Sequence, residues 1–217
     1  EIPLRLVGSE MCIRDRLQSY TINLYKEIEA LSGQSVGLHQ TGGFYAASTK
    51  EWYDYLKVER SKARYMGLDQ EFISPKELAE RHPLIDPNHY HAVLWDAQDG
   101  HLDPSGTTYA FAKAAKVHGA QYFTHCGATN MTQCPDGTWD VVTPKGSINA
   151  EHVVNCGGLW AREVGLMAGI HLPVQPMEHH YLITERINEV ENFGQQIPHG
   201  IDFEANIYCR QEGQGML

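Results

Sequence analysis

The chain has 217 residues and carries 17 basic and 27 acidic side chains, which gives a formal net charge of −10 at pH 7. This length predicts one large domain or two small ones. The acidic balance argues against nucleic acid and membrane surfaces as partners, because both favour a basic face. No apolar run approaches the ~20 residues of a membrane helix, and a hydrophobic content of 42% is that of a globular protein.

The five cysteines include no pair at the spacing of a zinc or redox motif, and their odd number does not favour a disulfide framework. We therefore expect reduced thiols and no metal site. Residues 1–16 show no helical or strand period, lack the apolar core of a signal peptide, and are similar to translated library-adaptor sequence. We expect this segment to be non-native and not to pack on the rest.

The sequence of the first half predicts four helices, three of them with an N-terminal capping signal, and several strands. Apolar residues at helical spacing predict a helix over 17–31 that stops at Gly33, and a hairpin follows over 36–47. Ser48 and Glu51 form a capping-box pattern before a second helix, and Ser74 and Glu77 repeat it before a short third one. A strand is expected over 91–95. Asp103 and Pro104 then predict the start of a helix that runs to 118–119.

The second half reads as a meander of short antiparallel strands, expected at 121–126, 128–134, 138–143, 147–150 and 151–156. Its last member, residues 153–156, is expected to be a buried strand. Gly157-Gly158 ends it, and a helix over 160–168 and a strand over 179–187 follow. Because the chain starts inside a helix and stops without a terminating signal, we expect it to be an internal piece of a longer protein.

Two stretches carry residues suited to chemistry. Gly157-Gly158 after an apolar strand lets backbone approach a ligand closely, and Trp160 can cover a flat ring; the alternative is a tight turn with a packed tryptophan. His179 lies on the predicted strand with Tyr181 on the same face, and such a histidine can hold or deprotonate an amine; the alternative is an ordinary strand histidine. In Asp-Gly-His-Leu-Asp-Pro at 99–104, Asp103 is better explained as a helix cap than as a metal ligand.

Four segments together resemble the flavoprotein part of the dimethylglycine and sarcosine dehydrogenases. They are LYKEIEALSGQSVGLHQTGGFYAAST, DGHLDPSGTTYAFAKAAKVHGA, DGTWDVVTPKGSINAEHVVNCGGLWAREVGLMAGI and PVQPMEHHYLITERI, and the resemblance covers nearly all of residues 17–217. It implies an α/β (α+β) fragment of a glutathione-reductase-like FAD domain, interleaved with an antiparallel-sheet substrate domain. Residues 17–35 and 102–170 would belong to the FAD domain, and residues 36–101 and 171–217 to one antiparallel substrate-domain sheet.

The reaction that the resemblance implies is oxidative N-demethylation of a methylated glycine, dimethylglycine or sarcosine, with hydride passing from the N-methyl carbon to the flavin. The cofactor is FAD, whose dinucleotide loop would lie upstream of this chain, and tetrahydrofolate is implied only for a separate C-terminal module. The partner is a small N-methylated amino acid, and the electron acceptor stays open. The expected location is the cytoplasm, or the mitochondrial matrix in a eukaryote.

The site residues follow from the same resemblance. Ala128 falls where a meander strand presents backbone to FAD, and Gly157, Gly158 and Trp160 fall on cofactor-contacting positions. His179 matches the active-site histidine. Tyr181 and Tyr208 are expected to bind substrate, although Ile207 stands where the dimethylglycine enzymes have the first tyrosine of a pair. That difference leaves the choice between dimethylglycine and sarcosine open.

Two other functions stay open. One is an amino-acid oxidase of the wider flavoprotein family, similar to the D-amino-acid and glycine oxidases. The other is a non-catalytic relative such as the pyruvate dehydrogenase phosphatase regulatory subunit, which shares the architecture. We expect the chain by itself to be inactive and prone to aggregation, because the glycine-rich phosphate loop and the first strand of the parallel sheet would lie upstream.

Overall fold

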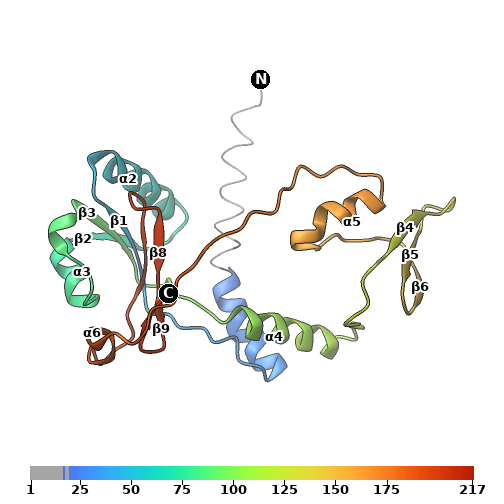
Figure 1. Ribbon diagram of the computed structural model, residues 1–217, viewed down its shortest axis with the longest axis horizontal. Helices are drawn as coiled ribbons and strands as arrows, with labels where there is room; N and C mark the ends of the chain where they lie inside the picture. Colours follow the sequence, from blue (N-terminus) through green and yellow to red (C-terminus); the bar gives the residue numbers. More distant parts are fainter. Residues whose placement is uncertain (1–16, 18–19) are drawn as a thin grey trace. The chain divides into compact units, whose positions relative to one another are not determined.

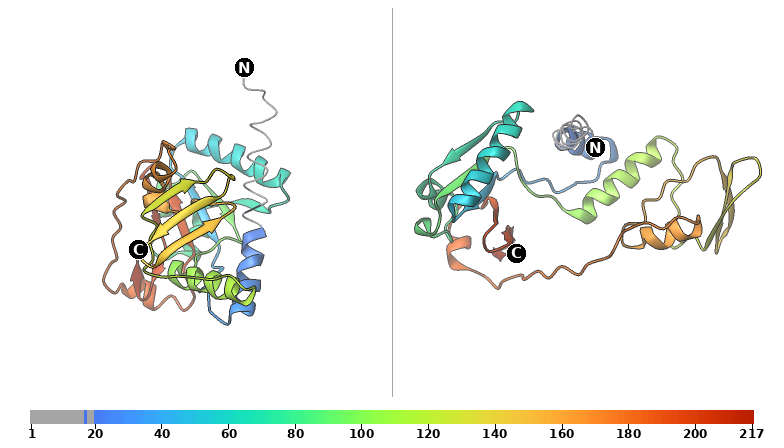
Figure 2. Two further views of the ribbon diagram at one scale, coloured as in Figure 1. Left: turned by 90° about the vertical axis from the view of Figure 1, so that its right-hand side faces the viewer. Right: turned by 90° about the horizontal axis from the view of Figure 1, so that it is seen from above.

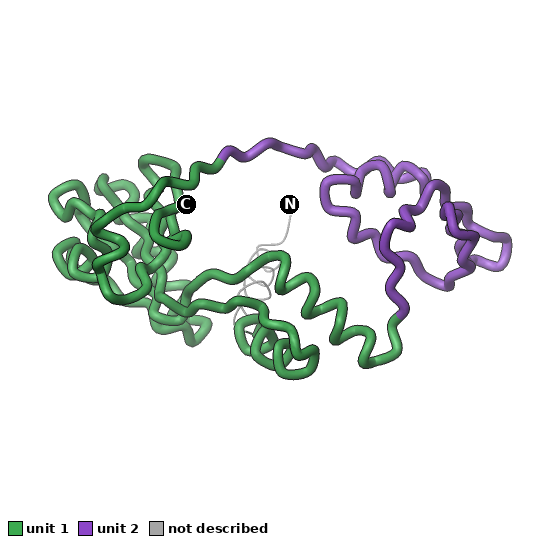
Figure 3. The backbone as a smooth tube through the Cα atoms, turned by 60° about the horizontal axis from the view of Figure 1, so that its bottom comes forward, with its two compact units in different colours: residues 1–120, 181–217 green, residues 121–180 purple. Residues whose placement is uncertain are grey.

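The computed structural model describes residue 17 and residues 20–217, so the expectation for residues 1–16 lies outside the described residues. The chain divides into two compact units (Figure 3). Unit 1 comprises Glu1–Ala120 and Tyr181–Leu217, and unit 2 comprises Gln121–His180. The assignment of segments to a FAD domain and a substrate domain stays a prediction. No helix in the described part of the chain is long and apolar enough to cross a membrane.

Unit 1 is built on a five-stranded sheet in the order β2-β3-β1-β7-β8. Its strands are β1 (Gly43–Ala47), β2 (Gln70–Ile73), β3 (Ala92–Asp96), β7 (His199–Asp202) and β8 (Ile207–Cys209). Residues 36–101 and 171–217 therefore contribute strands to one sheet, as the sequence predicts. The expectation that this sheet is antiparallel is wrong, because β1 pairs in parallel with β7 and antiparallel with β3.

Two helices pack on this sheet (Figure 1). Helix α2 (Lys50–Tyr65) begins after Thr49, whose side chain accepts a hydrogen bond from the Trp52 amide. The predicted cap at Ser48 is therefore wrong by one residue. Helix α3 (Pro75–Arg81) has the predicted capping box, with Ser74 and Glu77 each receiving the other's backbone amide. Both caps satisfy donors that a helix start leaves without an intrahelical partner.

The core of unit 1 lies on both faces of the sheet, because the side chains of β1 alternate. Phe44 and Ala46 join a buried cluster with Leu78 of α3, whereas Ala47 and the partly buried Tyr45 join a second cluster with Leu56 of α2. This period-2 alternation is what a strand buried on both faces requires. The short 3₁₀ turn η1 (Pro87–His89) leads into β3.

Gly200 of β7 lies directly under the Phe44 ring, and a Cβ placed there would overlap the ring. Phe44 is only 2% exposed, so a movement of its ring disturbs the packing of the buried cluster around it. We expect Gly200→Ala to lower the free energy of unfolding by about 1–3 kcal/mol through overpacking. Urea titrations measure this, with Gly127→Ala as the control, since no atom lies within 4 Å of a Cβ there. Equal midpoints for the two variants would contradict the close packing.

Three further helices and a short hairpin complete the described part of unit 1. A helix over residues 20–32 ends at Gly33, which has a φ of +64° as the predicted stop requires. Helix α4 (Pro104–Val117) begins after the predicted cap, Asp103, and ends at His118. Near the C-terminus, α6 (Asn188–Glu191), β9 (Gln211–Glu212) and β10 (Gly215–Met216) enclose a small core of Val190, Ile197 and Met216.

Unit 2 contains a three-stranded antiparallel sheet, β4 (Asn130–Gln133), β5 (Trp139–Thr143) and β6 (Gly146–Ala150), drawn as yellow arrows in Figure 2. The 3₁₀ turn η2 (Gly158–Trp160) and helix α5 (Ala161–Met167) follow. The outer strands expected at 121–126 and 153–156 are absent from this unit as described, and Val154 is 80% exposed. A strand needs a neighbour for its backbone groups, and these segments have none in unit 2.

Two more strand predictions are wrong. Residues 36–40 do not form a hairpin with β1, whose two neighbours are β3 and β7; His39 instead forms a single bridge with His101. Residues 179–187 follow an extended, irregular path, and the Thr184 amide donates to the carbonyl of Met216. Each segment has the apolar pattern of a strand, but whether it joins a sheet depends on strands that are distant in sequence.

Candidate functional site

The predicted cofactor residues all lie in unit 2, on the irregular segments around its sheet. Ala128 precedes β4 and is half-buried. Gly157 and Gly158 form the entry to η2, and Trp160, at its end, is 67% exposed. The alternative that Trp160 is a packed core residue is therefore wrong for the described unit.

Of the two glycines at Gly157-Gly158, only the second leaves space for another group to approach the backbone. A Cβ at Gly157 would lie 3.0 Å from Asn155 Oδ1 and 3.1 Å from the backbone of Ala161, so this glycine is enclosed by its own turn. Gly158 has a φ of +53° and no atom within 4 Å of a Cβ position, so the space in front of it is open. An open glycine beside an exposed indole fits a flat group such as a flavin dinucleotide.

The predicted catalytic and substrate residues are exposed. His179 lies near the end of unit 2, whereas Tyr181 and Tyr208 lie in unit 1 and are 71% and 62% exposed. Tyr208 and Ile207 are neighbours in β8 and point to opposite faces of the sheet. Ile207 shares its face with Cys209 and lines an apolar pocket of about 350 Å³ over β1, β7 and β8, a pocket whose lining does not include Tyr208.

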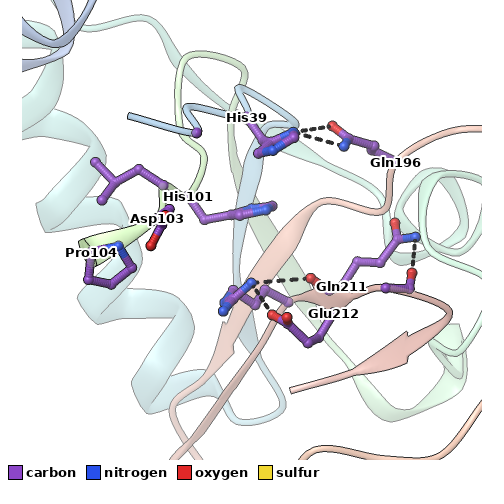
Figure 4. A pocket seen from close by; sticks show the side chains of 11 residues that line it. His39, His101, Asp103, Pro104, Gln196, Gln211 and Glu212 are labelled. Atoms are coloured by element: carbon purple, nitrogen blue, oxygen red, sulfur yellow. Dashed lines mark hydrogen bonds and ion pairs between the residues drawn. The ribbon is translucent and has the colours of Figure 1, made fainter. Parts of the chain in front are cut away.

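Unit 1 also contains a polar pocket that the sequence did not predict, which we call the histidine pocket (Figure 4). Its volume is about 390 Å³. It forms where the chain enters the sheet, where it leaves β3, and where it reaches the C-terminal hairpin. Its lining comprises Gly37, His39, His101, Leu102, Asp103, Pro104, Gln196, Arg210, Gln211, Glu212 and Gly213.

Two stacked imidazoles form one wall of the histidine pocket. The rings of His39 and His101 lie 5.1 Å apart at an angle of 17°, and the backbones of the two residues exchange hydrogen bonds of 2.8 and 3.0 Å. The side-chain amide of Gln196 contacts Nδ1 of His39 at 2.8 Å (Figure 4). These contacts hold together three segments that are far apart in sequence.

Behind this wall, a second group of polar side chains surrounds Asp99. Its Oδ2 accepts a hydrogen bond from the Tyr45 hydroxyl at 3.2 Å and lies 3.4 Å from Nε2 of His199. Burial, together with Arg210, His39 and His199, lowers the pKa of His101 below its ordinary value. His101 is therefore neutral at pH 7. Its Nδ1 is buried and has no hydrogen-bond partner among the described residues.

The opposite side of the pocket carries an ion pair. Nη1 of Arg210 lies 2.7 Å from Oε2 of Glu212 and donates to the carbonyl of Gln211. Asp103 borders the same space, with Oδ1 accepting the Ser105 amide as the cap of α4. Asp103 thus serves as the helix cap that the sequence predicts. In the part of the chain that the structure describes, no three His, Cys, Asp or Glu side chains are arranged to hold a metal ion.

The sequence contained only a weak signal for this pocket. His101 and Asp103 lie in the Asp-Gly-His-Leu-Asp-Pro stretch, but His39, Gln196 and Arg210 stand in stretches without a recognisable motif. The contact between His39 and Gln196 joins residues 157 positions apart. Local spacing cannot predict such a contact.

A family model described as FAD dependent oxidoreductase matches residues 7–217. Among curated proteins, mouse (Mus musculus) dimethylglycine dehydrogenase is 39% identical over 197 residues, and human (Homo sapiens) sarcosine dehydrogenase is 34% identical over 196 residues, covering 91% and 88% of this chain. Among solved structures, L-proline dehydrogenase from P. horikoshii superposes with a TM-score of 0.82 at 28% identity, covering 93% of this chain and 53% of that one.

The fold and the family match define the class of this chain as an FAD dependent oxidoreductase. The chain belongs to the FAD dependent oxidoreductase family, and its sequence is similar to dimethylglycine and sarcosine dehydrogenases, the relatives that its motifs resemble. It spans about a quarter of the length of these curated relatives, covering 23% of the mouse and 21% of the human protein. The family match starts at residue 7, inside the segment that the sequence suggests is non-native.

Proposed function

We propose that the whole protein carries out oxidative N-demethylation of a methylated glycine, with dimethylglycine or sarcosine as substrate. The observation that carries this proposal is the 39% identity with a dimethylglycine dehydrogenase across 91% of the chain. An acidic protein is compatible with this substrate class, because a zwitterion carries little net charge. The expected location stays the cytoplasm, or the mitochondrial matrix in a eukaryote.

In this proposal, some residues of this chain contact the cofactor and others contact the substrate. The open backbone at Gly158 and the exposed Trp160 indole would hold FAD, with Ala128 contributing backbone. When bound, FAD supplies the acceptor for the hydride of the N-methyl C–H bond. His179 would favour the neutral amine, whose lone pair must be free for oxidation, and Tyr181 and Tyr208 would contact the substrate. A separate module would transfer the one-carbon unit to tetrahydrofolate.

The test is anaerobic reduction of the flavin in the full-length protein. We expect a yellow protein that is bleached by dimethylglycine, by sarcosine or by both, and the ratio of the two rates identifies the substrate. Bleaching by glycine or a D-amino acid alone would instead indicate an amino-acid oxidase. A protein without flavin, or one that no amine bleaches, would contradict the proposal and favour the regulatory relative.

A further inference from the structure

We infer that the histidine pocket is a recognition site for a zwitterionic N-methylated amino acid, with Arg210 receiving the carboxylate and Glu212 and Asp103 receiving the ammonium. The inference rests on the proposed function for the identity of the ligand, and on the geometry of the pocket for the site. No predicted site residue lines this pocket.

The carboxylate half of the site is the free side of the Arg210 guanidinium. Within the described residues, Arg210 donates only through Nη1, to Glu212 and to the carbonyl of Gln211. Nε and Nη2 therefore keep their N–H groups without a partner there. These two nitrogens form the fork that binds a carboxylate through two parallel hydrogen bonds. The ion pair with Glu212 orients the guanidinium for this contact.

The ammonium half consists of two carboxylates that each keep one oxygen without a partner in the described part of the chain. Glu212 uses Oε2 for Arg210, and Asp103 uses Oδ1 for the Ser105 amide, which leaves Oε1 and Oδ2 for a ligand. Leu102 and Pro104 also line the pocket and supply apolar surface for N-methyl groups. A lining with one fixed positive and two fixed negative groups favours a ligand with both charges over a simple anion.

The charges of the histidine pocket also argue against a role in breaking the C–H bond. Two carboxylates stabilise the ammonium form, whereas oxidation of the amine needs its neutral form. The histidine pocket therefore captures the substrate and is not the place where the C–H bond breaks. Burial keeps the pKa of His101 below its ordinary value, so this ring borders the bound ligand without adding charge at pH 7.

The test uses three isosteric ligands: dimethylglycine, 3-methylbutanoate, which lacks the ammonium, and N,N-dimethylglycinamide, which lacks the carboxylate. Binding is measured by calorimetry on the full-length protein with its flavin chemically reduced beforehand, so that no ligand is turned over. We expect dimethylglycine to bind most tightly. Arg210→Gln should weaken dimethylglycine at the pocket roughly tenfold without weakening the cationic amide, and Glu212→Gln should weaken the amide.

Two further variants distinguish a specific loss of binding from misfolding of the protein. Arg210→Lys keeps the charge and the ion pair but lacks the fork, so it should lose part of the affinity for dimethylglycine. Arg186→Gln removes an exposed arginine that pairs with Glu191 outside the pocket, and it should change nothing. Isotherms for dimethylglycine that are identical in the wild type, Arg210→Gln and Glu212→Gln would overturn the inference. Failure of the proposed function appears separately, as no bleaching of the oxidised protein.

Discussion

Replacing His179 by alanine in the flavin-loaded, full-length protein is expected to slow flavin reduction about 100-fold, the lower end of what general acid–base groups contribute. The physical reason is the protonation state of the substrate. Near neutral pH most of the amine is protonated, and a neighbouring imidazole that holds or removes the proton increases the reactive fraction. Anaerobic stopped-flow measurements at saturating dimethylglycine or sarcosine give the rate directly.

His180→Ala is the matched control for this experiment. The two histidines are adjacent, and both are exposed in the described unit. We expect the control variant to keep the wild-type rate, and we expect both variants to keep their flavin, because cofactor binding is assigned to other residues. Equal rates for the wild type and His179→Ala would remove His179 from the mechanism.

The second large effect is expected from His82, which is 2% exposed between α3 and the sheet. Burial lowers its pKa from 6.5 to about 4. Above pH 6.5 the ring is neutral in both the folded and the unfolded state, and its contribution to stability does not change. As the pH falls from 6.5 to 4, only the unfolded state takes up a proton, so the free energy of unfolding decreases. Over the whole range between the two pKa values the decrease is about 3 kcal/mol.

The measurement is denaturant unfolding of the full-length protein and of His82→Phe between about pH 7.5 and pH 4.5. The phenylalanine keeps an aromatic ring against Phe44, whose centroid lies 5.6 Å from that of His82. Over this pH range we expect the loss of stability to be smaller in the variant by about 2.5 kcal/mol. His91→Phe, at an exposed position before β3, should keep the wild-type pH dependence. A wild-type slope in His82→Phe would show that other groups cause the acid sensitivity.

The candidate site residues were predictable only in part. Those in a local sequence pattern could be predicted, whereas those brought together by the fold could not. Trp160 and Gly158 could be singled out because a Gly-Gly turn after an apolar run is a local pattern; both are exposed, and their role in holding the cofactor stays a prediction. The histidine pocket could not, because it depends on Arg210 and His101 meeting across more than 100 positions of sequence. Nothing in the surroundings of either residue along the chain indicates that contact.

What the sequence determined by itself is the set of features that need only near neighbours. The capping box at Ser74, the cap at Asp103 and the stop at Gly33 each depend on hydrogen bonds or a backbone conformation within one helical turn. The motifs that indicate an FAD oxidoreductase are likewise short stretches of consecutive residues, so they can be recognised without knowing how the chain folds.

The tertiary structure alone decided how the strands pair. Residues 36–40 and 179–187 have strand-like composition but do not form strands, whereas β7 lies in parallel beside β1 although about 150 positions separate them. A strand is stable only when its amide and carbonyl groups meet those of another strand, and the partner is selected by the packing of the whole unit. For the same reason, the pocket that joins His39, His101 and Arg210 exists only in the folded chain.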